Sequence, residues 1–125
     1  MGMEIIQTKS ATITTVGGAG AATGYADFED VHGMLLDVYN NWHASAPVTS
    51  VATLTYNDPS LGTILACPAT ATDGLYAPRK ATVDAAGAAT GLYDLFPVNG
   101  KLRMTVTLSD ALTGALVSTI RYLQV

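Results

Sequence analysis

The chain of 125 residues is long enough for one domain with a sizeable core, and 49% of its residues are hydrophobic whereas only 13% are charged. Its formal charge of -4, with six dispersed lysines and arginines, argues against nucleic acid or an anionic membrane surface as a partner, because phosphates are bound by clustered positive charge. So few charges are typical of a surface that other chains partly cover.

The single cysteine, Cys67, excludes an intrachain disulfide. It ends the apolar run TILAC, so we expect a buried structural thiol rather than a nucleophile. No apolar run reaches the length of a transmembrane helix, and the first residues lack the pattern of a secretion signal. We therefore expect a single domain, residues 1–125, that is neither secreted nor bound to a membrane.

Short stretches rich in Thr, Val and Ile predict β-strands along most of the chain. Turn-forming residues separate them at intervals of about 8 to 12 residues, a spacing typical of an antiparallel β-sandwich or barrel. The sequence therefore predicts an all-β fold. The expected strands are residues 4–8, 11–15, 48–56, 63–67, 81–84, 101–108 and 116–123.

The segment from residue 28 to residue 42 fits two structures. Its apolar residues follow one another at alternating spacings of three and four, and Asp27 precedes them as a helix cap, which is typical of an amphipathic helix. Against a helix, Gly33 lies in the middle, and part of the segment alternates like a strand if Asn40 marks an irregularity. Periodicity alone favours the helix slightly. The spaced residues are Phe28, Val31, Leu35, Val38 and Trp42.

Two β-hairpins are predicted near the C-terminus. Asn99-Gly100 supplies the two positive-φ positions of a type I′ turn, between FPV and KLRMTVTL. Residues 109–114 then join RMTVTL to LVSTIRYL as a second hairpin. The chain is therefore expected to end on a paired strand, with Val125 close to the core.

The hexapeptide AGAATG occurs twice, at residues 19–24 and 86–91. The first copy superficially resembles a phosphate-binding loop. However, it lacks the third glycine of the dinucleotide fingerprint, no Lys-Ser/Thr pair follows it, and acidic residues come next. We therefore expect loops in both places, with no cofactor bound.

An acidic cluster follows the first copy. Asp27, Glu29, Asp30 and His32 could be imagined as a cation site, but a solvated acidic edge is the favoured interpretation. His32 and His43 are eleven residues apart, which is not a zinc-binding spacing. Neither a nucleophile motif nor an acid–base pair of carboxylates is recognisable. The sequence thus predicts a protein that is not an enzyme, with no catalytic, cofactor-binding or metal-binding residues.

The stretch DGLYAPRK holds the candidate partner-binding residues Tyr76, Pro78, Arg79 and Lys80. A proline suits an edge strand, and the one adjacent basic pair of an acidic chain is suited to meet an acidic partner. In the alternative interpretation, Tyr76 packs in the core while Arg79 and Lys80 protect an exposed edge from misassociation.

Five short segments follow one another along the chain: SATITTVGGAG, VHGMLLDVY, VTSVATLTY, DGLYAPRK and NGKLRMTVTL. They give a Thr-rich first strand with a Gly-rich loop, a His/Ile-Gly-hydrophobic strand, a second Thr-rich strand, a turn before aromatic-x-Pro-Arg, and a closing Gly-(Lys/Arg)-Leu-x-(Val/Met)-x-Val strand. This order resembles that of small β-sandwich structural proteins of tailed bacteriophages.

This resemblance implies an antiparallel β-sandwich, Ig-like or of the jelly-roll Greek-key type, with residues 31–39 as a strand and both AGAATG copies as inter-strand loops. It also implies a virion protein that is in the host cytoplasm during assembly. Capsid decoration or cementing is the favoured role, with the major capsid protein or neighbouring virion proteins and further copies of itself as partners. A head-to-tail neck or tail component is the alternative.

A carbohydrate-binding module is a weaker alternative that does not depend on the resemblance. Such sandwiches expose aromatic side chains that stack on sugars. Trp42 with Tyr39 is the one candidate pair for this role.

Overall fold

The computed structural model describes residues 5–124, which form an antiparallel all-β fold. Hydrogen-bonded neighbours follow the order β1-β8-β2-β7-β3-β4, while β5 pairs with β2 and β6 with β7. None of the described residues belongs to a helix long enough to cross a membrane. The elements are β1 (Ile5–Ile13), β2 (Ala22–Trp42), β3 (Val51–Tyr56), the 3-10 turn η1 (Pro59–Leu61), β4 (Thr63–Ala66), β5 (Gly74–Tyr76), β6 (Arg79–Val83), β7 (Ala89–Ser109) and β8 (Leu116–Gln124).

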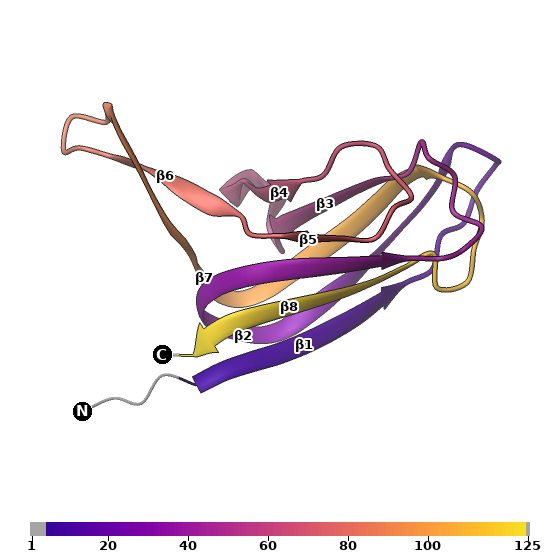
Figure 1. Ribbon diagram of the computed structural model, residues 1–125, viewed down its shortest axis with the longest axis horizontal. Coiled ribbons are helices and arrows are strands. Elements are labelled where there is room, and N and C mark those ends of the chain that lie inside the picture. The colour runs from indigo at the N-terminus through magenta and orange to yellow at the C-terminus, as the bar shows by residue number, and fades with distance from the viewer. Residues whose placement is uncertain (1–4, 125) are drawn as a thin grey trace.

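The long strand β2 belongs to two layers. Its residues 22–35 pair with β7, whereas residues 33–42 pair with β8. One layer therefore contains β1, β8, the end of β2 and β5, and the other contains the start of β2, β7, β3 and β4. In Figure 1 the first of these layers lies in front, with β7 and β3 behind it. The expected all-β, sandwich-like fold is confirmed.

The core fills the space between the two layers and receives side chains from β1, β2, β3, β4, β7 and β8. Most of these side chains are small or medium-sized aliphatic groups. Cys67, which follows β4, is also part of the core. The largest side chains that are fully buried include Phe28, Ile13, Leu35, Leu54, Leu102, Met104, Leu116 and Ile120.

Strand β2 covers the whole contested segment, so the preference of the periodicity for a helix is wrong. The pairing register shifts between Phe28 and Val31 and again between Leu35 and Asp37. Each shift is a β-bulge, which inserts one residue and brings the next inward side chain after three positions instead of two. Spacings of three across the bulges and four between them reproduce the pattern of a helix. The strand implied by the phage resemblance is the structure observed.

The predicted hairpin at Asn99-Gly100 is also wrong. β7 runs through these residues without turning, and they pair with His32 and Val31 of β2. Gly100 has a positive φ of 116°, but Asn99 does not have one, although a type I′ turn needs it at both positions. The dipeptide lies beside the first bulge of β2, where Asp30 adopts a φ of 53°. The glycine therefore accommodates an irregular ladder rather than a chain reversal.

The expected hairpin at residues 109–114 is wrong as well, because β7 and β8 do not pair. The chain instead crosses from one layer to the other, and β8 lies between β1 and β2. The described chain does end on a paired strand, as predicted. Val125 and Glu4, the first residue of the first predicted strand, lie outside the described residues.

The remaining strand predictions hold with shifted boundaries. The two predicted N-terminal strands form one strand, β1, and the strand predicted at residues 48–56 begins at Val51. The sequence does not predict β5, because its first residue, Gly74, follows the turn-forming residues Thr72 and Asp73. Both AGAATG copies form the end of a turn and the beginning of a long strand, β2 or β7, with Gly20 and Gly87 at φ values of 72° and 83°.

Gly33 is a position where the fold requires the absence of a side chain. Its φ is 144°, and a Cβ atom there would lie 1.7 Å from the carbonyl oxygen of Leu123 in β8. We expect Gly33→Ala to lower the free energy of unfolding by more than about 3 kcal/mol, because the backbone ladder must separate to admit the methyl group. Urea denaturation measures the change.

The matched control is Gly100→Ala. Gly100 also has a positive φ and lies in a strand, but nothing lies within 4 Å of the position of its Cβ. This variant should lower the free energy of unfolding by only about 1 kcal/mol, through backbone strain alone. Equal losses in the two variants would contradict a specific close approach at Gly33.

Candidate functional site

A two-stranded hairpin, residues 79–95, projects from the body of the molecule (Figure 1). We call this hairpin the arm. It consists of β6 and the first part of β7, and neither of these segments pairs with any other described strand. The arm begins where β7 separates from β2, beyond the pair Leu35–Phe96. It is therefore joined to the body only at its base.

Local hydrogen bonds explain the hairpin conformation. The hydroxyl groups of Thr82 and Thr90 lie 2.6 Å apart across the two strands. At the tip, Asp84 Oδ1 accepts hydrogen bonds from the backbone N–H groups of Ala86 and Ala88, both at 2.9 Å. Such a turn satisfies its own polar groups. An isolated two-stranded hairpin nevertheless has marginal stability in water.

The arm exposes apolar side chains on both of its faces. Val83, Leu92 and Tyr93 are 59%, 68% and 70% exposed. Leu92 and Tyr93 are consecutive in a strand, so their side chains point to opposite faces. Neither face of the arm is therefore covered within the chain, which is typical of a segment that packs against another molecule.

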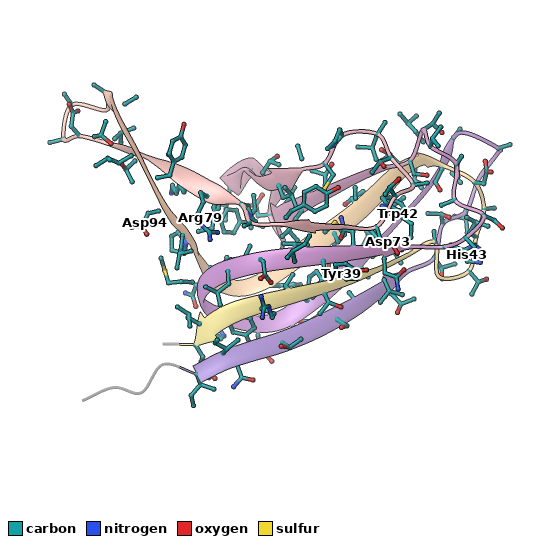
Figure 2. The ribbon with its side chains drawn as sticks, viewed as in Figure 1. Tyr39, Trp42, His43, Asp73, Arg79 and Asp94 are labelled. Atoms are coloured by element: carbon teal, nitrogen blue, oxygen red, sulfur yellow. The ribbon has the colours of Figure 1, made fainter. Side chains whose placement is uncertain are left out.

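The four candidate residues predicted from the sequence lie at the base of the arm, but they do not form one patch. Tyr76, in β5, packs against the core, and Pro78 is buried. Arg79 donates hydrogen bonds to the carbonyl oxygens of Leu36, at 3.0 Å, and Pro78, at 2.9 Å. Figure 2 shows Arg79 near Asp94 where the arm leaves the body. Arg79 thus fixes the base of the arm to the second bulge of β2.

Lys80 differs from Arg79. It lies opposite Asp94 in the arm, and its ammonium group has neither a hydrogen bond nor an ion pair with residues 5–124. The other basic side chains bind carboxylates or backbone carbonyl groups. These are Lys9, Arg79, Lys101, Arg103 and Arg121.

Two residues of the acidic cluster, Asp27 and Glu29, are held by ion pairs. Asp27 lies directly opposite Arg103 of β7, 2.8 Å from its Nε atom, and Glu29 lies 3.3 Å from Lys101 Nζ. These cross-strand pairs partly neutralise the edge that the sequence predicts as simply solvated. Within residues 5–124, no group of three or more His, Cys, Asp or Glu side chains could hold a metal ion.

The aromatic pair considered for sugar binding does not share a face. Trp42 is 6% exposed, whereas Tyr39 is 42% exposed on the outer side of β2. The backbone N–H of Trp42 donates to Asp73 Oδ1 at 2.7 Å, and Figure 2 shows this contact region next to β5. The two rings therefore form no common stacking surface.

Cys67 is buried, as the sequence predicts. The amide of Asn40 donates to its sulfur at 3.6 Å, and Ser118 Oγ donates to Asn40 Oδ1 at 2.9 Å. Burial raises the pKa of the Cys67 thiol, and hydrogen bonds with Tyr76 and Asn40 offset part of this effect. This buried polar chain connects the two layers. Sequence reasoning missed the role of Asn40, which was treated as an irregularity in the strand alternation.

The two basic residues at the base of the arm should respond differently to loss of charge. We expect Arg79→Met to destabilise the protein by about 1 kcal/mol and to accelerate amide hydrogen exchange in residues 79–95, because the bond to Leu36 is lost. Lys80→Met should change stability by less than about 0.5 kcal/mol. Equal exchange rates in the arms of both variants would exclude the anchoring role of Arg79.

Because of Cys67, the free energy of unfolding should fall as the pH becomes alkaline. Since burial raises its pKa above the ordinary 9.0, the unfolded chain releases the thiol proton first. The buried, protonated thiol therefore contributes fully to the free energy of unfolding below about pH 9.0, and this contribution is lost as the pH rises toward the folded-state pKa. Urea denaturation between about pH 8.5 and 10.5 should show a shallower decline for Cys67→Ala than for the natural chain. Parallel declines would contradict this assignment.

Comparisons with known proteins assign no family to this chain. No protein-family model, no curated protein and no solved structure matches it. Among the described residues, the arm combines exposed apolar side chains with a fixed base, and we take it as the candidate functional site.

Proposed function

We propose that this protein is a non-enzymatic virion structural protein of a tailed bacteriophage that decorates or cements the capsid by bridging capsid subunits. The arm is the observation that carries the proposal. A hairpin with large apolar side chains on both faces gains stability when other protein surface covers it. Its role is therefore assembly with other chains.

Most acidic side chains of the described residues have partners within the chain. Asp27, Glu29 and Asp37 are paired with basic side chains of the same chain. Four further aspartates accept backbone N–H groups in or near turns, so much of the acidic charge serves the fold itself. These are Asp58, Asp73, Asp84 and Asp110.

A decorating protein acts through binding. It stabilises the assembled shell by mass action, because it binds the shell and not its separated subunits. The arm suits bridging because its strands extend roughly 20 Å at about 3.3 Å per residue. It can therefore contact a neighbouring chain of the assembly that the body does not reach.

The proposal is tested by adding the purified protein to phage capsids that lack it. The capsids should bind the protein in many copies over the shell and break at a higher temperature than bare capsids. Calorimetry and electron microscopy measure these two effects. Binding of the protein at a single vertex of the capsid would indicate a neck or tail component instead. Absence of binding would overturn the proposal.

A matched pair of variants tests the part played by the arm. Leu92→Ser should weaken capsid binding by about tenfold, since a large apolar contact is lost. Leu61→Ser is the control, because Leu61 is also 68% exposed but lies outside the arm. Equal binding of both variants would show that the arm is not used.

A further inference from the structure

We infer that the arm of one chain packs on the body of a second copy of the same chain, over the outward-facing pair Tyr39 and Leu75. This inference deepens the proposed function, since it rests on the assembly role of the arm and names the partner. The arm supplies one half of the contact, and the outer face of β2 and β5 supplies the other half.

The receiving surface, which we call the patch, has an exposed apolar pair at its centre and lies beside the ion pair of Asp37 and Arg121. Tyr39 and Leu75 are directly opposite each other in the β2–β5 ladder and are 42% and 64% exposed. On the other side of Tyr39 lies Thr119, whose hydroxyl is 2.8 Å from that of Ser10. β5 pairs only with β2 among the described strands, so its other edge is also free. The patch therefore offers apolar surface beside a free strand edge.

The arm has enough surface for a stable contact. An extended chain exposes about 1.45 Å² per dalton, so residues 79–95 would expose roughly 2,500 Å² before folding. Every arm residue except Thr82 and Leu95 remains exposed, and none is buried. The arm thus offers on the order of 1,000 Å² over its two faces, and a reciprocal pair would bury one arm and one patch of each chain, which approaches the roughly 800 Å² that a standard interface takes from each partner.

The charges favour a second copy as the occupant. Arg79 and Lys80 are balanced by Asp84 and Asp94, so the arm has no net charge and the formal charge of -4 belongs to the rest of the chain. A neutral arm can therefore lie on the acidic body of another copy without bringing like charges together.

The geometry requires the contact to be between chains. The arm continues beyond the end of β5 and leads away from the body (Figure 1), and Arg79 holds its base to Leu36. It therefore does not fold back onto the patch of its own chain. Each chain carries both an arm and a patch, so copies can associate reciprocally as a pair or head to tail as a closed ring.

Cross-linking between two singly substituted chains tests the contact. A Tyr93→Cys chain and a tagged Leu75→Cys chain are mixed in the absence of capsids and treated with a short bis-maleimide. Cys67 is buried and does not compete. A cross-linked product that contains both chains is expected. A Leu61→Cys chain mixed with the same Leu75→Cys chain is the control and should give at least about tenfold less product.

Sedimentation provides the second measurement. The natural protein should sediment as an oligomer, and the Leu92→Ser/Tyr93→Ser variant should associate at least about tenfold more weakly while keeping its β-type circular dichroism. The Tyr39→Ser/Leu75→Ser variant should have the same defect.

Three results would overturn the inference. A natural protein that stays monomeric, with no product between the Tyr93→Cys and Leu75→Cys chains, would exclude a second copy. An oligomer that cross-links between two Tyr93→Cys chains and not to the Leu75→Cys chain would exclude the patch. A monomer that still decorates capsids would assign the arm to a different partner. The last result would leave the proposed function intact, because capsid binding is measured separately.

Discussion

The close approach of β2 and β8 at Gly33 is the constraint on which the rest of the fold depends. Around this residue β2 pairs with β7 on one side and β8 on the other, so both layers meet along one backbone. A side chain at Gly33 would collide with the carbonyl oxygen of Leu123. The two bulges on either side keep the inward side chains of β2 directed at a common core while the strand passes from one layer to the other.

The second bulge also determines where the arm begins. The carbonyl of Leu36, the residue inserted there, accepts the hydrogen bond from Arg79. β7 separates from β2 one residue earlier, at Leu35. The second bulge of β2 therefore lies where β7 leaves the body, and it also provides the carbonyl group that holds β6. The arm is thus continuous with the strands of the sandwich and is not a separate loop inserted between them.

The sequence predicts the fold class because Thr, Val and Ile fill the strands and turn residues separate them. The same signals fail at β2, where two bulges turn a strand pattern into a helical one, and at Asn99-Gly100, where a turn dipeptide lies inside a strand. The buried thiol follows from the apolar run before Cys67. The stretch from Tyr76 to Lys80 is distinctive in sequence, but its division into a packed part and a free part depends on pairing between distant strands. The exposed arm is visible only once that pairing is known.

The continuity of β7 has a mechanical consequence. This strand runs from the arm into the body, where its later residues pair with β2 on one side and β3 on the other. Hydrogen bonds of antiparallel ladders lie perpendicular to the strands. A pull on the arm along β7 is therefore a shear force shared by many hydrogen bonds at once, rather than a peeling force that breaks them one after another. Any partner that pulls on the arm in this direction would therefore load many of these hydrogen bonds together.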